Sequence, residues 1–181
     1  MTSYTTQNSL LLNNLLQFYK KDTNLETMLN IINGESPISL RIVDWFVTNY
    51  AKQKFTVYNL SEGVRFKVYT DYKLKLKAYS KRRFDPFCRW DRITIPYKED
   101  KLIQTTIGQL NFFKWALENE IITYIKDNYN EIERDMNNRN STSKKRITLT
   151  NSKTRKKREE LSISASKTIK QENVSVTIKF D

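Results

Sequence analysis

One periodic pattern of apolar residues limits the fold of this chain more than any other feature. From Thr105 or Thr106 to about Asn138, apolar residues recur every three or four positions, which predicts a helix with one apolar face. This face holds Ile107, Leu110, Phe113, Leu117, Ile121, Tyr124, Ile125, Ile132 and Met136. Unbroken, such a helix would be roughly 50 Å long, so it must cross the whole folded body or project from it. Phe112 and Trp115 widen the apolar face near its start, so we expect that half to pack in the core.

Shorter helical patterns come before this long one. Residues 7–20 place leucines on one helical stripe, and residues 39–52 form another such pattern. Between them, Thr23 and Glu26 have the spacing of a capping box, and Gly34 marks the end of the helix that the box opens. Three short helices with short connections predict a small bundle.

The period changes to two beyond Lys54, which is typical of strands. Strands are predicted at 55–57, 64–68 and 92–97, with Glu62 and Gly63 supplying a turn between the first two. Residues 72–80 fit a strand with lysines on its solvent face, and they also fit a helix. We favour a strand followed by a short helix. The fold class predicted is α+β, with short N-terminal helices, a small antiparallel sheet and one long C-terminal helix.

Charge is distributed unevenly along the 181 residues. Residues 1–138 carry a net charge of +4, whereas residues 139–158 hold nine basic residues and no acidic one. We therefore predict a folded domain at 1–138 and a flexible, disordered basic linker at 139–160. Residues 161–181 form a short terminal β segment, which either docks on the body as a hairpin or adds a strand to a sheet edge, here or in a partner.

The composition argues against catalysis. The chain has no histidine, one cysteine (Cys88) and three isolated glycines, so the commonest acid–base residue, a structural zinc site and a phosphate-binding glycine loop are missing. We expect no enzyme activity, no cofactor and no metal. Asp127, Glu131 and Asp135 could serve a metal-dependent nuclease, although a solvated helix face is strongly favoured. No apolar run spans a membrane, and the N-terminus lacks the basic region of a signal peptide.

Residues 72–92 carry the clearest binding signal. They hold eight Lys or Arg against two Asp, interleaved with aromatic rings, which suits a nucleic-acid surface and equally a structural turn with basic residues facing water. The tail adds two basic clusters that could contribute nonspecific affinity. The nucleic-acid-binding residues predicted are Lys73, Lys75, Lys77, Tyr79, Lys81, Arg82, Arg83, Arg89, Trp90, Arg92, Lys144, Lys145, Arg146, Lys153, Arg155, Lys156, Lys157 and Arg158.

Three sequence blocks carry a family resemblance. DWFVTNYAK at 44–52, KAYSKRRFDPFCRW at 77–90 and TTIGQLNFFKWALEN at 105–119 resemble a group of uncharacterised proteins from nucleocytoplasmic large DNA viruses, mimivirus-like and chlorovirus-like members included. The resemblance covers roughly 36–138 and transfers no functional residues. It implies a setting in the cytoplasm of an infected host cell, with a viral factory and a packaged DNA genome.

The leading hypothesis is a non-enzymatic protein of a large DNA virus that binds DNA or RNA, mainly through phosphates. It would act in genome packaging, virion structure or viral gene expression, in the host cytoplasm, the virion or the host nucleus. The alternative is a structural or scaffolding protein that binds other viral proteins, or a second copy of itself, through the long helix and the terminal strand. No membrane partner is expected. The sequence does not distinguish DNA from RNA.

Overall fold

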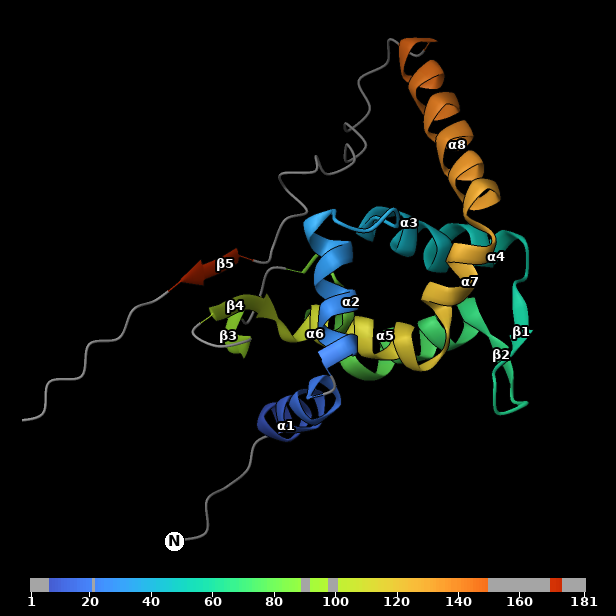
Figure 1. Ribbon diagram of the computed structural model, residues 1–181. Coiled ribbons are helices and arrows are strands. Elements are labelled where there is room, and N and C mark those ends of the chain that lie inside the picture. Colours follow the sequence, from blue (N-terminus) through green and yellow to red (C-terminus); the bar gives the residue numbers. More distant parts are fainter. Residues whose placement is uncertain (1–6, 21, 89–91, 98–100, 150–169, 174–181) are drawn as a thin grey trace, which may run out of the picture.

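The computed structural model describes residues 7–20, 22–88, 92–97, 101–149 and 170–173 (Figure 1). It confirms the α+β fold class. The helical elements are α1 Gln7–Tyr19, α2 Asp22–Asn33, α3 Leu40–Trp45, the π-helical turn η1 Phe46–Tyr50, α4 Ala51–Gln53, α5 Val68–Phe84, α6 Ile107–Glu118, α7 Ile121–Asp127 and α8 Tyr129–Leu149. The strands are β1 Val57–Asn59, β2 Arg65–Lys67, β3 Arg92–Tyr97, β4 Lys101–Thr106 and β5 Lys170–Asn173.

Helix α6 forms the centre of the fold. A helix that is apolar nearly all round must be enclosed by other elements, and α1, α2 and α5 all pack against α6. Figure 1 shows α6 in the middle of the molecule. Its buried residues are Ile107, Gly108, Gln109, Leu110, Asn111, Phe112, Phe113, Trp115 and Ala116. The expectation that this first half of the apolar pattern lies in the core is confirmed.

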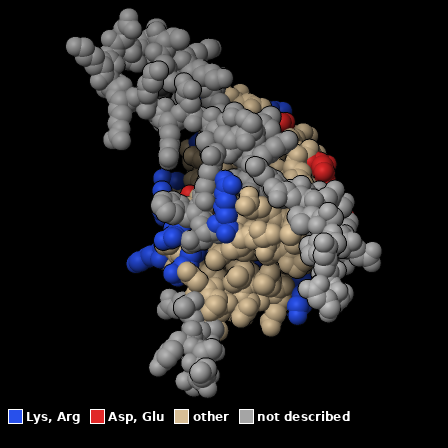
Figure 2. Space-filling view, turned by 90° about the vertical axis from the view of Figure 1, so that its left-hand side faces the viewer, with Lys and Arg blue, Asp and Glu red and all other residues tan. Residues whose placement is uncertain are grey.

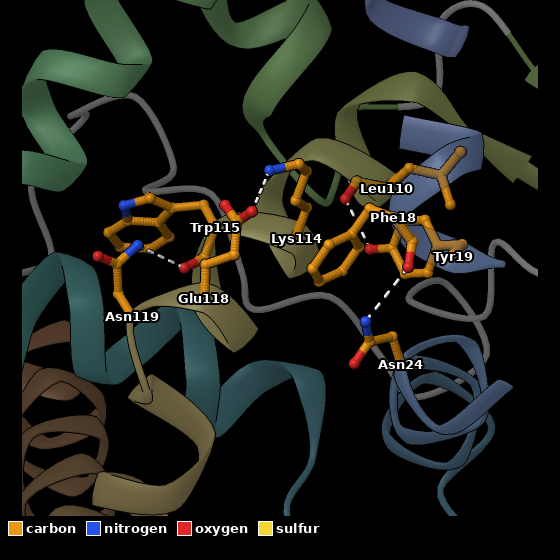
Figure 3. A network of polar contacts seen from close by, with 8 residues as sticks. All are labelled: Phe18, Tyr19, Asn24, Leu110, Lys114, Trp115, Glu118 and Asn119. Atoms are coloured by element: carbon orange, nitrogen blue, oxygen red, sulfur yellow. Dashed lines mark hydrogen bonds and ion pairs between the residues drawn. The ribbon is translucent and has the colours of Figure 1, made fainter. Parts of the chain in front are cut away.

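Polar contacts fix α1 on α6 (Figure 3). The buried Tyr19 hydroxyl donates a hydrogen bond of 2.7 Å to the carbonyl of Leu110. Lys114 pairs with Glu118 one turn further along α6, and its ammonium lies 5.1 Å from the centroid of the Phe18 ring. These contacts satisfy the polar groups at an otherwise apolar junction, so they set where α1 lies along α6.

The prediction of one unbroken helix from Thr105 to Asn138 is wrong, because two asparagines interrupt it. The Asn119 side chain donates to the carbonyl of Trp115 at 2.8 Å, and the following residue, Glu120, has a left-handed backbone with φ 55°. Asn128 repeats the first contact, donating to the Tyr124 carbonyl at 2.9 Å. Asparagine side chains compete with the helix for its own carbonyls, so α6, α7 and α8 are separate helices.

Helix α8 runs past the predicted domain boundary at 138. Residues 139–149 are therefore helical, where a disordered linker was expected, and 150–160 lie outside the described residues. Asp135 anchors the base of α8, since it accepts a 3.0 Å hydrogen bond from Trp45 Nε1 and pairs with Arg139 at 3.0 Å. Beyond this anchor, α8 extends away from the rest of the structure (Figure 1). The division of the chain into body and tail stays a prediction.

The strands form two small antiparallel sheets. β1 pairs with β2, and Gly63, with φ 77°, lies in the predicted turn between them. β3, β4 and β5 form the second sheet in that order, with Ile95 opposite Ile103 and both side chains buried. β4 was not predicted, because the long helix was expected to begin at Thr105 or Thr106 and the residues before it carry no clear alternation. In the terminal segment, β5 adds a strand to the chain's own sheet, whereas 161–169 and 174–181 lie outside the described residues.

Residues 72–80 are helical, so the strand favoured for them is wrong. The helical period turns Val68 and Tyr72 inward, and both are buried. Tyr72 packs 5.8 Å from Trp115 between ring centroids. The burial of Tyr72 against Trp115 stabilises the helix. The alternation of lysines favours a strand only when these tertiary contacts are left out of account. No helix among the described residues is long and apolar enough to span a membrane.

Gly108 carries a first prediction, since a Cβ at this position would lie 2.8 Å from the backbone oxygen of Asp85. Gly→Ala inside a helix ordinarily stabilises by about 1 kcal/mol. Here the clash with backbone should reverse the sign, so Gly108→Ala should lower the free energy of unfolding by about 1–3 kcal/mol. Denaturant unfolding of the full chain measures the change.

An exposed α7 position supplies the control for this substitution. Thr123→Ala should change the free energy of unfolding by less than about 0.5 kcal/mol. If Gly108→Ala proves neutral or stabilising, α6 does not pack closely on the segment after α5.

Candidate nucleic-acid interface

Helix α5 presents a strongly basic surface. Its sequence holds six basic residues and one acidic residue, Asp71. Trp115 Nε1 donates a 2.6 Å hydrogen bond to Asp71, which holds that carboxylate against the buried indole. Lys73, Lys77 and Lys81 are exposed. Figure 2 shows Lys and Arg side chains gathered on one side of the face in view.

A shallow, open groove of about 620 Å³ runs along α5, and the described residues that line it all belong to this one helix. Residues four apart share a helix face, which places Tyr69, Lys73 and Lys77 in one row. Leu74 is 60% exposed in the same groove, and the ammonium of Lys52 lies 5.7 Å from the Tyr69 ring centroid. None of the described residues lining this α5 groove is acidic; they are Tyr69, Thr70, Lys73, Leu74, Leu76, Lys77 and Lys81.

Ser80 bends α5 between two groups of basic residues. Its φ of 65° and ψ of 164° lie in a backbone region that is essentially restricted to glycine. Such a conformation costs of order 1–3 kcal/mol and persists only where the surrounding structure determines it. The bend separates Lys81, Arg82 and Arg83 from the helical turns before it, while Lys81 still lines the same groove as Lys73 and Lys77.

Contacts with α6 hold the segment after the bend in place. Asn111 Nδ2 donates a 2.9 Å hydrogen bond to the carbonyl of Arg83. Phe84 is fully buried, with its ring centroid 5.5 Å from that of Trp115. On its other side, the Tyr79 ring stacks on Phe84 at 6.0 Å. These contacts supply the stabilisation that offsets the strain at Ser80.

Asp85 ends the basic segment and faces a second carboxyl group. Burial, together with the charge of Asp85, raises the pKa of Asp44 to about 7 from an ordinary value of 3.8. Burial and the same two carboxylates also raise the pKa of Tyr72. Asp44 is therefore partly protonated at neutral pH, which limits the negative charge next to the basic segment.

The structure brings together only part of the predicted site. Lys73, Lys77, Lys81 and Arg82 are exposed on α5, whereas Lys75, Tyr79 and Arg83 are half-buried. Tyr79 packs on the core through Phe84 rather than standing free as a ring for stacking. Arg92 lies on β3, 3.5 Å from Gln104 Oε1.

The remaining predicted residues have side chains that the structure does not describe. Lys144, Lys145 and Arg146 belong to the outer part of α8, and their side chains are not described. Arg89, Trp90, Lys153, Arg155, Lys156, Lys157 and Arg158 lie outside the described residues. Tyr69, Thr70, Leu74 and Leu76 were not predicted as site residues, although the helical alternative for 72–80, extended back by one turn, places them near the lysines. Lys52, on α4, was also not predicted, and no local pattern places it there.

The three carboxylates considered for a nuclease, for which a solvated helix face was favoured, do not form a cluster. Asp127 ends α7, while Glu131 and Asp135 lie on α8 beyond the break at Asn128. Asp135 is held by Trp45 and Arg139, and Glu131 lies 3.6 Å from Lys54. Among the described residues, no group of three or more carboxylate or thiol side chains could hold a metal ion. The Cys88 thiol is half-buried.

The comparisons place the chain in a family. A family model described as a family of unknown function (DUF7197) matches residues 2–179. The chain belongs to this family. It is also 48% identical over 119 residues to an uncharacterized protein, L507, of Acanthamoeba polyphaga mimivirus; the match covers 61% of this chain and 46% of that protein. The resemblance to proteins of large DNA viruses is thus confirmed. No solved structure matches significantly.

The backbone strain at Ser80 leads to a second prediction. Ser80→Gly should be more stable than Ser80→Ala by about 1 kcal/mol, because both lose the hydroxyl and only glycine adopts this backbone without strain. Thermal unfolding of the two variants measures the difference. Equal stabilities, or a less stable glycine variant, would show that α5 does not bend in this way at Ser80.

Proposed function

We propose that this protein is a non-enzymatic nucleic-acid-binding protein whose α5 groove contacts the phosphates of DNA or RNA. One observation carries the proposal: three exposed lysines, Lys73, Lys77 and Lys81, border one groove that no described acidic residue lines. An anion bound there would meet several cations at once. Lysines that merely keep a surface soluble would be interspersed with acidic residues.

The physical basis is counterion release. Each phosphate neutralised by a lysine frees condensed counterions, so several lysines on one face give an affinity that falls steeply with salt. The basic tail adds to this term, since residues 139–158 hold nine basic residues. In this proposal the tail supplies nonspecific attraction and the α5 groove fixes the position of the strand.

The similarity to a mimivirus protein supports a role in a large DNA virus. The roles that we propose for this protein are genome packaging, virion structure or viral gene expression. We place its action in the viral factory of the host cytoplasm or in the virion, with the host nucleus as the alternative. This setting rests on the relative alone.

A scaffolding role is the second candidate, favoured by the position of α8. That helix extends away from the other elements (Figure 1), and a projecting helix can pair with another protein or with a second copy of this chain. In that case binding would involve α8 and would be largely independent of the α5 lysines.

A salt titration of oligonucleotide binding tests the proposal. The variant Lys73→Gln/Lys77→Gln/Lys81→Gln removes three cations from exposed positions and should leave the fold intact. If each lysine neutralises one phosphate, the slope of log K against log salt should fall by about 2–3. Fluorescence anisotropy with a labelled DNA and a labelled RNA strand gives the slopes.

The control removes the same charge from elsewhere on the body. Lys20→Gln/Lys126→Gln/Arg134→Gln changes three exposed cations outside the groove and should retain most of the slope. Equal losses in the two triple variants would mean that net charge, and not the α5 groove, attracts nucleic acid. No binding by the unaltered chain near physiological salt, together with a concentration-dependent dimer, would favour scaffolding.

A further inference from the structure

The floor of the α5 groove differs from its rim. The rim carries the ammonium groups of Lys73, Lys77 and Lys81, and Leu74 supplies the apolar floor beside Lys77. Leu76, two residues from Leu74, lies on the other side of the lysine row and packs against the core, as Tyr69 does. Leu74 is 60% exposed on an otherwise basic helix, where a polar side chain would ordinarily be expected. A ligand made only of phosphate would leave this apolar surface in water.

From this arrangement we infer that the α5 groove binds single-stranded nucleic acid, with phosphates on the lysine rim and bases against Leu74. The inference rests on the proposed function and narrows it to one class of strand. It predicts an apolar contact between the bases and the groove, which phosphate binding alone does not require.

The spacing of the rim fits such a polymer. Lys73 and Lys77 are four residues apart, which is ~6 Å along a helix axis. Neighbouring phosphates of an extended strand have a comparable separation, and each nucleotide also carries a flat base to one side of the backbone. The Thr70 hydroxyl lies in the same groove and can exchange hydrogen bonds with a base edge or a sugar. A row of cations beside an exposed leucine thus matches a row of phosphates beside bases.

A duplex fits the groove less well. Its bases are stacked inside the helix, so it can offer its phosphates to the lysines but no ring face to Leu74. Duplex binding would gain the electrostatic term alone and bury little of the apolar floor. The groove should therefore prefer single strands over duplexes of equal length.

The test compares three probes that carry the same backbone. They are an oligothymidylate of about 15 nucleotides, an abasic strand of the same length and a duplex of that length. The full chain should bind the oligothymidylate roughly tenfold more tightly than the abasic strand, since base contacts commonly contribute this much. The lysine triple variant should weaken binding of all three.

A leucine pair supplies the matched variants. Leu74→Ala removes apolar surface from the groove floor and should weaken oligothymidylate binding about fivefold while leaving abasic binding unchanged. Leu10→Ala removes a leucine that is 53% exposed on α1 and should change neither. Both side chains are largely in solvent, so neither substitution should unfold the protein.

The outcomes separate the two proposals. Equal binding of oligothymidylate and abasic strand, with the lysine variant weakening both, overturns the base contact and leaves phosphate binding in place. If the lysine variant binds both the oligothymidylate and the abasic strand as tightly as the unaltered chain does, both proposals are overturned. Binding of an acidic, apolar-rich peptide in the groove, with no oligonucleotide binding, also overturns both and assigns the surface to a protein partner.

Discussion

The burial of α6 around most of its circumference is the constraint on which the rest of the structure depends. Phe112, Phe113 and Ala116 are fully buried, whereas Lys114 and Glu118 reach solvent, so all but one side of α6 needs an element to cover it. α1, α2 and α5 meet that need. The helices are short and mostly amphipathic, and each is stabilised by its contact with this shared partner more than by its own propensity.

The same constraint shapes the basic surface. Because α5 must lay Tyr72 and Phe84 against α6, its lysines are turned outward. Because Gly108 and Asn111 hold the segment after Ser80, the backbone bends there despite the strain. The position of the α5 groove thus follows from core packing. The lysines on its rim face solvent, so their charges are not buried in the core.

Some of this could be predicted from the sequence. The α+β class, the helices near 7–20 and 39–52, and the strand at 92–97 follow from local periodicity, which is a property of neighbouring residues. The core position of Trp115 followed from the width of its apolar face.

Other features depended on contacts that periodicity does not contain. Whether 72–80 is strand or helix is decided by rings far away in the chain, such as Trp115. The helix breaks at Asn119 and Asn128 depend on which carbonyl each amide reaches. Leu74 and Tyr69 belong to the candidate site only because α5 is a helix, whereas the lysines were recognisable from charge alone.

Hydrogen–deuterium exchange of the full chain, with and without a saturating single-stranded oligonucleotide, tests the central claim most directly. Ligand contact slows exchange of the amides beneath it, so the peptides that change identify the binding surface without any substitution. The account predicts protection over α5, strongest around Lys73–Lys81, with any protection of 139–158 accompanying it. Protection confined to 139–158, with α5 unchanged, would contradict the assignment of the α5 groove as the binding site.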